Sequence, residues 1–422
     1  MQNRIVDVIA RQILDSRGNP TIETAIYTEK GIKATASVPS GLSKGIFEAF
    51  ELRDNNPYYY RGNSVLKAVL NVNDCISRSI IGQNVLNQFQ IDNIMLELDS
   101  SKNKKNLGAN TILSVSLACA RAAAKSLEIP LYQYIGGINS HIMPVPMINV
   151  LNGGLHADNG LDFQEFMIVP YGFQSFSEAL RAANDVFFKL KEILIRRGLS
   201  ISVGDEGGFS PETASAELAL EFLTEAVIQA NYNTDKIKIA IDLAASQFYS
   251  DGYYNLEGEN LYLNSSEFCN YLISLTEKYP IISLEDCMAE SDFTGWKMLS
   301  ELLNDKIMIV ADDLSVTNFE KINELVSDKI ANTILIKPNQ TGTLSETLKA
   351  VETAKNANYN VIISNRSGET ADTFISDLSV GINGGFIKTG SLSRSERTEK
   401  YNRLLKIESE LKNNSVFNQI KL

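Results

Sequence analysis

The sequence has few of the residues that often carry chemistry: among 422 residues there are two histidines, four cysteines and one tryptophan. The cysteines stand singly, without the close pairs of zinc or redox motifs, which favours a reducing compartment. No apolar run is long enough to span a bilayer, and residues 1–8 lack the apolar core of a signal peptide. We therefore expect a cytoplasmic protein.

Positive charge is also scarce. The chain has 39 lysines and arginines against 51 aspartates and glutamates, a net charge of −12. Nucleic acid and anionic membranes are therefore not expected as partners. An anionic substrate would need a local cationic pocket to overcome this field.

The first third of the chain predicts an α+β domain. Residues 4 to about 38 have the pattern of strands, interrupted by a turn signal at residues 17–20. Helical patterns dominate from residue 60 to residue 127. At this length two domains are expected. We place an N-terminal domain at residues 1–137, a linker rich in glycine and proline at 138–145, and a larger domain at 146–422.

Three short apolar runs in the larger domain each end in a carboxylate, at Asp242, Glu285 and Asp312. Such runs are typical of strands buried on both faces in a parallel sheet, so the acids should converge on one rim. Carboxylates held together need a cation, and oxygen ligands suit Mg²⁺. We predict that these three residues bind Mg²⁺. Asp286 and Asp313, which follow two of them, either support the ligands or face solvent.

The same pattern continues towards the C-terminus. Further apolar runs end near Lys337, Asn365 and Lys388, and the successive intervals from Asp242 onwards are 43, 27, 25, 28 and 23 residues. Two earlier runs, residues 147–151 and 166–169, bring the number of strands to eight. Eight strands separated by helices predict an α/β protein with a (β/α)8-type barrel, although its ββαα opening is irregular. Its chemistry should lie at the C-terminal ends of the strands.

Two lysines and one loop add to this rim. Lys337 is either a salt-bridge partner of the acids or a base with a lowered pKa. Lys388 supplies a second ammonium. Two neighbouring ammoniums disfavour each other's charge, which supports the interpretation that one of the two lysines is a neutral base. The small, glycine-bounded loop at residues 39–45 is either a surface connection or a mobile lid that contributes a hydroxyl.

Other polar residues follow turns beside the strand ends. Glu206 is either part of a tight glycine turn or placed for close approach to a ligand. His156 is either a structural residue or part of the site, and Glu165 supplies another acid. Arg366, followed by Ser367, suits a phosphate or a carboxylate. A metal site, a base, an acid and an anion clamp together predict proton abstraction beside a carboxylate, followed by loss of a leaving group.

Over nearly its whole length the chain resembles enolase. The resemblance rests on seven separated segments in the family's order: residues 13–20, 108–110, 143–146, 164–167, 203–208, 364–370 and 387–390. It implies an irregular enolase-type barrel, similar to a TIM barrel, with a smaller N-terminal α+β capping domain. It also implies a hydro-lyase of glycolysis that dehydrates 2-phosphoglycerate to phosphoenolpyruvate, two Mg²⁺ ions per active site, and a homodimer or larger homo-oligomer.

The resemblance implies a role for each matching residue. Lys337 takes the proton from C2 of the substrate, and Glu206 protonates the departing hydroxyl with the help of Glu165. Ser43, in the loop, contacts the substrate and assists a second Mg²⁺. The implied ligands of the first Mg²⁺ are Asp242, Glu285 and Asp312. Arg366 and Ser367 are implied to hold the phosphate, and Lys388 the carboxylate side. The resemblance also implies that His156 lines the pocket as a catalytic residue, and that Gln164 and Asn365 line it as substrate-binding residues.

The chain departs from the family's pattern at several places. The family has histidine where this chain has Asn365, which cannot carry a positive charge beside the substrate. Leu42 and Lys44 replace small residues in the loop, Gln247 stands where glutamate is usual, and Pro338 is unusual after the base. Three functions are therefore open. They are a working enolase, a relative specialised for another phosphate, phosphonate or carboxyphosphonate in a biosynthetic pathway, and a catalytically weak scaffold or binding protein.

Overall fold

The N-terminal part of the protein is built on a small antiparallel sheet. The computed structural model describes residues 3–42 and 45–418. The sheet has the order β1-β2-β3, with β1 at Ile5–Leu14, β2 at Pro20–Thr28 and β3 at Lys33–Ser37. The predicted turn between β1 and β2 forms because Asp15 accepts hydrogen bonds from the backbone of Arg17 and Asn19.

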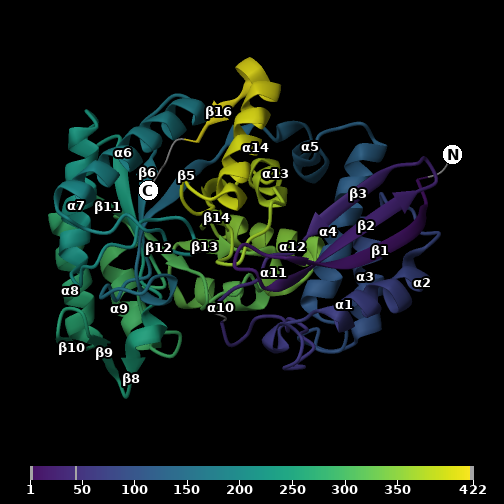
Figure 1. Ribbon diagram of the computed structural model, residues 1–422, viewed down its shortest axis with the longest axis horizontal. Helices are drawn as coiled ribbons and strands as arrows, with labels where there is room; N and C mark the ends of the chain where they lie inside the picture. Colours follow the sequence, from purple (N-terminus) through teal and green to yellow (C-terminus); the bar gives the residue numbers. More distant parts are fainter. Residues whose placement is uncertain (1–2, 43–44, 419–422) are drawn as a thin grey trace.

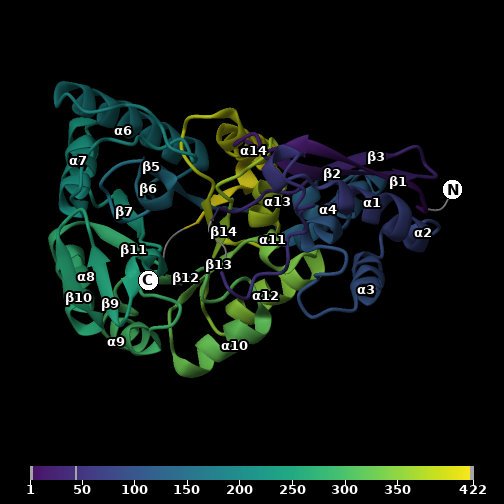
Figure 2. The same ribbon diagram turned by 60° about the horizontal axis from the view of Figure 1, so that its bottom comes forward.

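Helices complete this domain. They are α1 (Leu66–Leu70), α2 (Ser77–Ile80), α3 (Gln88–Asp99), α4 (Ala109–Ser126) and α5 (Leu131–Gly136). Nearly all residues of α4 are buried, because it packs on β2 and β3 and also contacts the second domain. Its many alanines and serines allow this close approach on several sides. Figures 1 and 2 show the sheet and its helices to one side of the larger domain.

The larger domain is a closed barrel of eight strands, as the sequence predicts. Around the ring the strands are β5 (Val145–Asn152), β6 (Glu165–Pro170), β7 (Ile237–Asp242), β11 (Ile281–Glu285), β12 (Met308–Ala311), β13 (Thr333–Ile336), β14 (Asn360–Ser364) and β15 (Gly385–Lys388). Their side chains are buried on both faces, which explains the continuous apolar runs.

One strand of the barrel runs against the others. β6 pairs antiparallel with both β5 and β7, whereas the other neighbouring strands are parallel. Because β6 is reversed, its first residue, Glu165, is level with Asp242 at the end of β7. A residue that begins a strand thus joins the rim formed by strand ends. The apolar run of β6 does not reveal this reversal, because composition and length carry no direction.

Helices surround the barrel (Figures 1 and 2). They are α6 (Phe176–Arg196), α7 (Ala216–Gln229), α8 (Ser265–Lys278), α9 (Phe293–Leu303), α10 (Phe319–Asp328), α11 (Pro338–Thr341), α12 (Leu344–Asn356), α13 (Phe374–Gly381) and α14 (Ser395–Leu411). One apolar stripe of α6 is buried against the barrel, and Gly198, with φ of +71°, follows the end of the helix.

Two short sheets lie outside the barrel. The long 43-residue interval before Glu285 holds β8 (Tyr249–Ser250), β9 (Tyr253–Leu256) and β10 (Leu261–Asn264), so it is more than the single strand–helix unit that its spacing suggests. Within the predicted linker, β4 (Ile142–Met143) pairs with β16 (Val416–Phe417) near the C-terminus. No helix in the described ranges is both long and apolar enough to cross a membrane.

Candidate active site

The described residues predicted for the site meet at one rim of the barrel. They surround a pocket of about 20 Å³, whose lining includes His156, Gln164, Glu165, Glu206, Asp242, Asp312, Lys337, Asn365, Arg366, Ser367 and Lys388. Glu285 joins them through Lys388. Ser43 and Lys44 lie outside the described residues, so their predicted roles stay predictions. The barrel rim therefore brings together side chains that are far apart in the sequence.

Lys388 is the centre of one half of the pocket. Its Nζ donates to Asp242 Oδ2 and Glu285 Oε1, both at 2.8 Å, and lies 3.3 Å from Glu165 Oε2. Burial alone would lower the pKa of Lys388, but the neighbouring carboxylates raise it well above its ordinary value. Lys388 is therefore a fixed cation.

Lys337 lies directly after β13 and forms an ion pair with Asp312 Oδ2. Burial lowers the pKa of Lys337, but Asp312 and Asp313 together raise it above its ordinary value. Of the two interpretations of this lysine, the structure thus shows the salt bridge. Pro338 follows without conflict, because it is the first residue of α11, where a missing N–H costs nothing.

Asp286 supports the neighbouring strand end. Its two carboxylate oxygens accept hydrogen bonds from the backbone N–H groups of Asp312, at 3.0 Å, and Asp313, at 3.1 Å. Burial and the adjacent acids raise the pKa of Asp286 well above its ordinary value and that of Asp313 to about 8. Of the two roles expected for Asp286, the buried supporting one is found.

On the other side of the pocket, His156, Glu165 and Glu206 form a compact group. His156 Nδ1 lies 3.3 Å from Glu165 Oε1, and Asn365 donates its side-chain amide to Glu206 Oε1 at 3.2 Å. Burial and the charge of Glu206 raise the pKa of Glu165. Burial also acts on Glu206, but Arg397, His156 and Lys388 outweigh it and hold the pKa of Glu206 at about 2. Two adjacent carboxyls with opposite pKa shifts are typical of paired acid and base positions.

The predicted anion clamp, Arg366 and Ser367, is bound by groups from the loop and from Glu48 just after it. Glu48 accepts two hydrogen bonds from the guanidinium of Arg366, both at 3.1 Å. The hydroxyl of Ser367 accepts a hydrogen bond from the backbone N–H of Leu42 at 2.8 Å. Gly41 allows this approach, since a Cβ there would lie 1.8 Å from Arg366 Nη2. An internal carboxylate therefore occupies the groups expected to bind an anion.

The unusual Gln247 also has a place near the site. Its side-chain amide donates to Gln164 Oε1 at 2.8 Å, and Gln164 in turn donates to Asp242 Oδ2 at 3.3 Å. Gln247 thus reaches the pocket through another glutamine.

The residues at the rim fit a divalent cation. Two groups of donor side chains in the described chain have ligand atoms within 4.8 Å of one another; they are His156, Glu165 and Glu206, and Asp286, Asp312 and Asp313. Asp242 and Glu285 share the Lys388 ammonium instead, but Glu285 Oε2 is buried without a hydrogen-bond partner in the described ranges. A buried carboxylate oxygen with no partner is an available ligand, and an all-oxygen donor set suits Mg²⁺.

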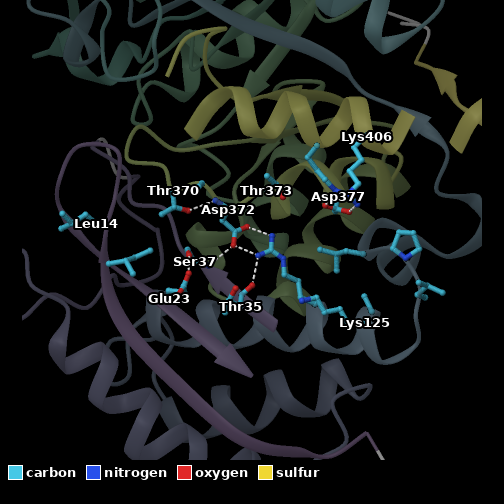
Figure 3. Close-up of a pocket in the computed structure, with 18 residues that line it drawn as sticks. Leu14, Glu23, Thr35, Ser37, Lys125, Thr370, Asp372, Thr373, Asp377 and Lys406 are labelled. Carbon is cyan, nitrogen blue, oxygen red and sulfur yellow. Dashed lines mark hydrogen bonds and ion pairs between the residues drawn. The ribbon is translucent and has the colours of Figure 1, made fainter. Parts of the chain in front are cut away.

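A larger cavity lies elsewhere, between the N-terminal domain and the barrel (Figure 3). Its volume is about 760 Å³, and none of the predicted site residues lines it. At its centre Arg121 donates to the carbonyl of Thr35 at 2.8 Å and to both oxygens of Asp372, at 2.6 and 2.7 Å. Asp372 also accepts from the backbone N–H of Ser37 at 2.9 Å. Because these groups pair with one another, we interpret this cavity as part of the contact between the domains.

Two residues at the site were not predicted. Glu48 follows the loop in a stretch with the pattern of an ordinary amphipathic segment. The position of this acid between Phe47 and Ala49 is only a weak indication of a buried charge. Arg397 lies in a run of alternating charges that suggests a solvated helix face, yet it is fully buried. Both residues act on the anion clamp, and sequence spacing alone does not connect them to it.

Comparison with known families agrees with the fold. Residues 5–135 match the family described as enolase, N-terminal domain, and residues 140–422 match the one described as enolase, C-terminal TIM barrel domain. The two matches together cover almost the whole sequence, so the chain belongs to the enolase family. The resemblance and the fold expected from the sequence are thereby confirmed. The protein is a lyase of the enolase superfamily, a group that generally uses Mg²⁺.

Proposed function

We propose that this enolase-family lyase dehydrates 2-phosphoglycerate to phosphoenolpyruvate, the glycolytic reaction, with Mg²⁺ as its cofactor. The carrying observation is that a lysine and a group of acids lie on opposite sides of one pocket. Lys337 follows β13, and Glu165 begins β6, which is four strands from β13 in either direction around the barrel. Glu206 lies beside Glu165. This placement suits removal of a proton from one carbon and of a hydroxyl from the next.

The proposed substrate has two anionic groups, and the pocket offers a partner for each. Arg366 and Ser367 suit the phosphate, because a planar guanidinium binds phosphate oxygens in pairs. Lys388, buried and fixed in charge, suits the carboxylate. Substrate must displace Glu48 from Arg366 to reach the clamp.

Proton transfer is assigned to residues on the two opposite sides of the pocket. Lys337 accepts the proton from C2, and Glu206 delivers one to the hydroxyl that leaves as water. The raised pKa of Glu165 and the lowered pKa of Glu206 support a role for Glu165 in helping Glu206 to deliver this proton. Mg²⁺ held by Asp242, Glu285 and Asp312 would supply positive charge for the substrate's carboxylate oxygens and offset the acids that keep Lys337 protonated.

A second candidate is a lyase with the same chemistry on another phosphate, phosphonate or carboxyphosphonate. The observation that favours it is Asn365, whose amide binds Glu206 directly. A neutral amide at this position alters the charge next to the acid, and with it the leaving group that the acid serves best.

The test is formation of phosphoenolpyruvate from 2-phosphoglycerate by the purified chain, followed by its ultraviolet absorbance with Mg²⁺ or with a chelator. We expect turnover with Mg²⁺ and none after chelation. Lys337→Met should fold normally but lose turnover, which controls for a contaminating enzyme. If the protein binds Mg²⁺ yet forms no phosphoenolpyruvate, the proposal is wrong, and turnover of a phosphonate or carboxyphosphonate would then establish the second candidate.

Two further expectations go with this function. We propose that the protein acts in the cytoplasm and that it assembles as a homodimer or a larger homo-oligomer. Both rest on the family resemblance, and size measurement of the purified chain by light scattering tests the second.

A further inference from the structure

Arg397 is a fully buried cation on the first turn of α14, and no role in the reaction has been given to it above. Its guanidinium donates three hydrogen bonds, all to backbone carbonyls. Nη1 donates to Arg366 O at 2.7 Å, and Nη2 donates to Ser367 O at 2.6 Å and to Asp205 O at 3.2 Å. The hydrogen bonds thus all go to neutral partners, although two carboxylates lie within ion-pair distance of the guanidinium.

These carbonyls belong to two different loops of the site. Arg366 and Ser367 form the anion clamp after β14, whereas Asp205 immediately precedes Glu206 in the acid loop (residues 203–208). The two loops are far apart in the sequence, and the guanidinium joins them directly. The planar fork of arginine can reach acceptors on both sides, which the single ammonium of lysine does less well.

The charge of Arg397 is directed at the acid. Three neutral carbonyls leave its positive charge without full compensation, and Nη1 lies 4.0 Å from Glu206 Oε1. The remaining carboxylate nearby is that of Glu396, 3.5 Å from Nε. Gly390, just after β15, packs closely against both groups, since a Cβ there would lie 2.6 Å from Arg397 Cδ and 2.9 Å from Glu206 O.

A second buried cation on the same helix shows what is particular to Arg397. Lys400 Nζ binds Glu369 Oε2 at 2.8 Å and Thr370 O at 2.6 Å, both on the clamp side. No hydrogen bond or ion pair joins Lys400 to the acid loop in the described chain. Of these two cations of α14, Arg397 is the one that spans both loops.

We propose that Arg397 is a positioning residue that locks the anion clamp and the acid loop into one unit, so that anion binding at Arg366 and Ser367 also orders Glu206. The proposal deepens the proposed function and rests on it for the chemical roles of the clamp and the acid. The same guanidinium should then determine both anion affinity and turnover.

The first test is Arg397→Lys, which keeps the charge but removes the fork. Arg403→Lys is the matched control, because Arg403 is on the same helix and pairs with Asp377 and Glu410, away from both loops. We expect Arg397→Lys to weaken binding of inorganic phosphate and to lower kcat for 2-phosphoglycerate, each by at least about tenfold. Arg403→Lys should change neither. A purely structural role would lower the folded fraction and the apparent kcat, but leave the phosphate Kd of the folded protein unchanged.

The second test needs no variant and applies even if Arg397→Lys does not fold. Hydrogen exchange of the native protein is measured with and without inorganic phosphate. Phosphate should slow exchange in residues 364–370 and also in residues 203–208. Protection confined to residues 364–370 would overturn the coupling. Both phosphate measurements are independent of turnover, so a protein that binds phosphate but forms no phosphoenolpyruvate would refute the proposed function without deciding against Arg397.

Discussion

Glu48 should compete with substrate for the anion clamp, and Glu48→Gln should therefore strengthen anion binding. Glu48 holds the Arg366 guanidinium through two hydrogen bonds of 3.1 Å each. The two side chains are only 8% and 4% exposed, so solvent screens their attraction weakly. A phosphate that binds these same two guanidinium nitrogens must displace Glu48.

The size of the effect follows from these two contacts. Hydrogen bonds to a charged group contribute about 1.5–3 kcal/mol each, and glutamine retains one acceptor oxygen but no charge. The substitution should therefore release about 2 kcal/mol of competition, which corresponds to a roughly 30-fold lower Kd for phosphate. Gln340, which donates to Glu48 Oε1 at 3.2 Å, can still donate to the new amide oxygen.

The assay is calorimetric titration of the purified protein with inorganic phosphate. Glu346→Gln is the matched control, because Glu346 also pairs with a cation, Lys104, at 2.8 Å, but away from the clamp. Its phosphate Kd should equal that of the native protein. An unchanged or weaker affinity in Glu48→Gln would refute the reasoning, since it would mean that Glu48 orients Arg366 for the anion instead of competing with it.

Three other perturbations test separate parts of the structure. Asn365→His keeps a donor near Glu206 and adds a titratable cation, so kcat for 2-phosphoglycerate should rise about tenfold; an unchanged kcat would contradict this. Burial raises the pKa of Asp162 to about 6, so the free energy of unfolding should fall as the pH rises from about 4 to 6. Asp162→Asn should abolish this pH dependence in urea titrations. At pH 7 the same variant should gain about 1 kcal/mol of unfolding free energy, after allowance for the partial exposure of the side chain. Arg121→Met leaves Asp372 buried and unpaired and should cost about 3 kcal/mol of unfolding free energy, whereas Arg78→Met, which breaks an exposed pair, should cost under about 1 kcal/mol.

Much of the barrel could be predicted because its strands are buried on both faces. That environment demands uninterrupted apolar runs, and the first polar residue then marks where each strand leaves the core. Asp242, Glu285 and Lys388 are the last residues of their strands, and Lys337 directly follows its own. The residues of the rim could therefore be predicted from the polar residues that follow each apolar run.

The direction of a strand and the partners of a buried charge could not be predicted in this way. The apolar run after Glu165 has the same pattern in either direction, so the reversal of β6 depends on its neighbours. Glu48 binds Arg366, 318 positions away, and Arg397 binds Asp205, 192 positions away. Glu48 stands among apolar residues and Arg397 in a charged run typical of a solvated helix face, and neither pattern reveals these partners. Only the folded chain shows that these charges are buried.

The rim lacks positive charge, and this shortage links its electrostatics to its proposed chemistry. Lys337, Lys388 and Arg366 face a larger number of carboxylates, and burial together with neighbouring acids raises the pKa of Glu165 and Glu285. Because the whole chain has a net charge of −12, the rest of the protein does not compensate the excess of carboxylates at the rim. An anionic substrate would increase the shortage further, so positive charge that enters with the substrate should strengthen its binding. The buried carboxylates that disfavour an anion at the rim are thus the same groups that make the rim suitable for Mg²⁺.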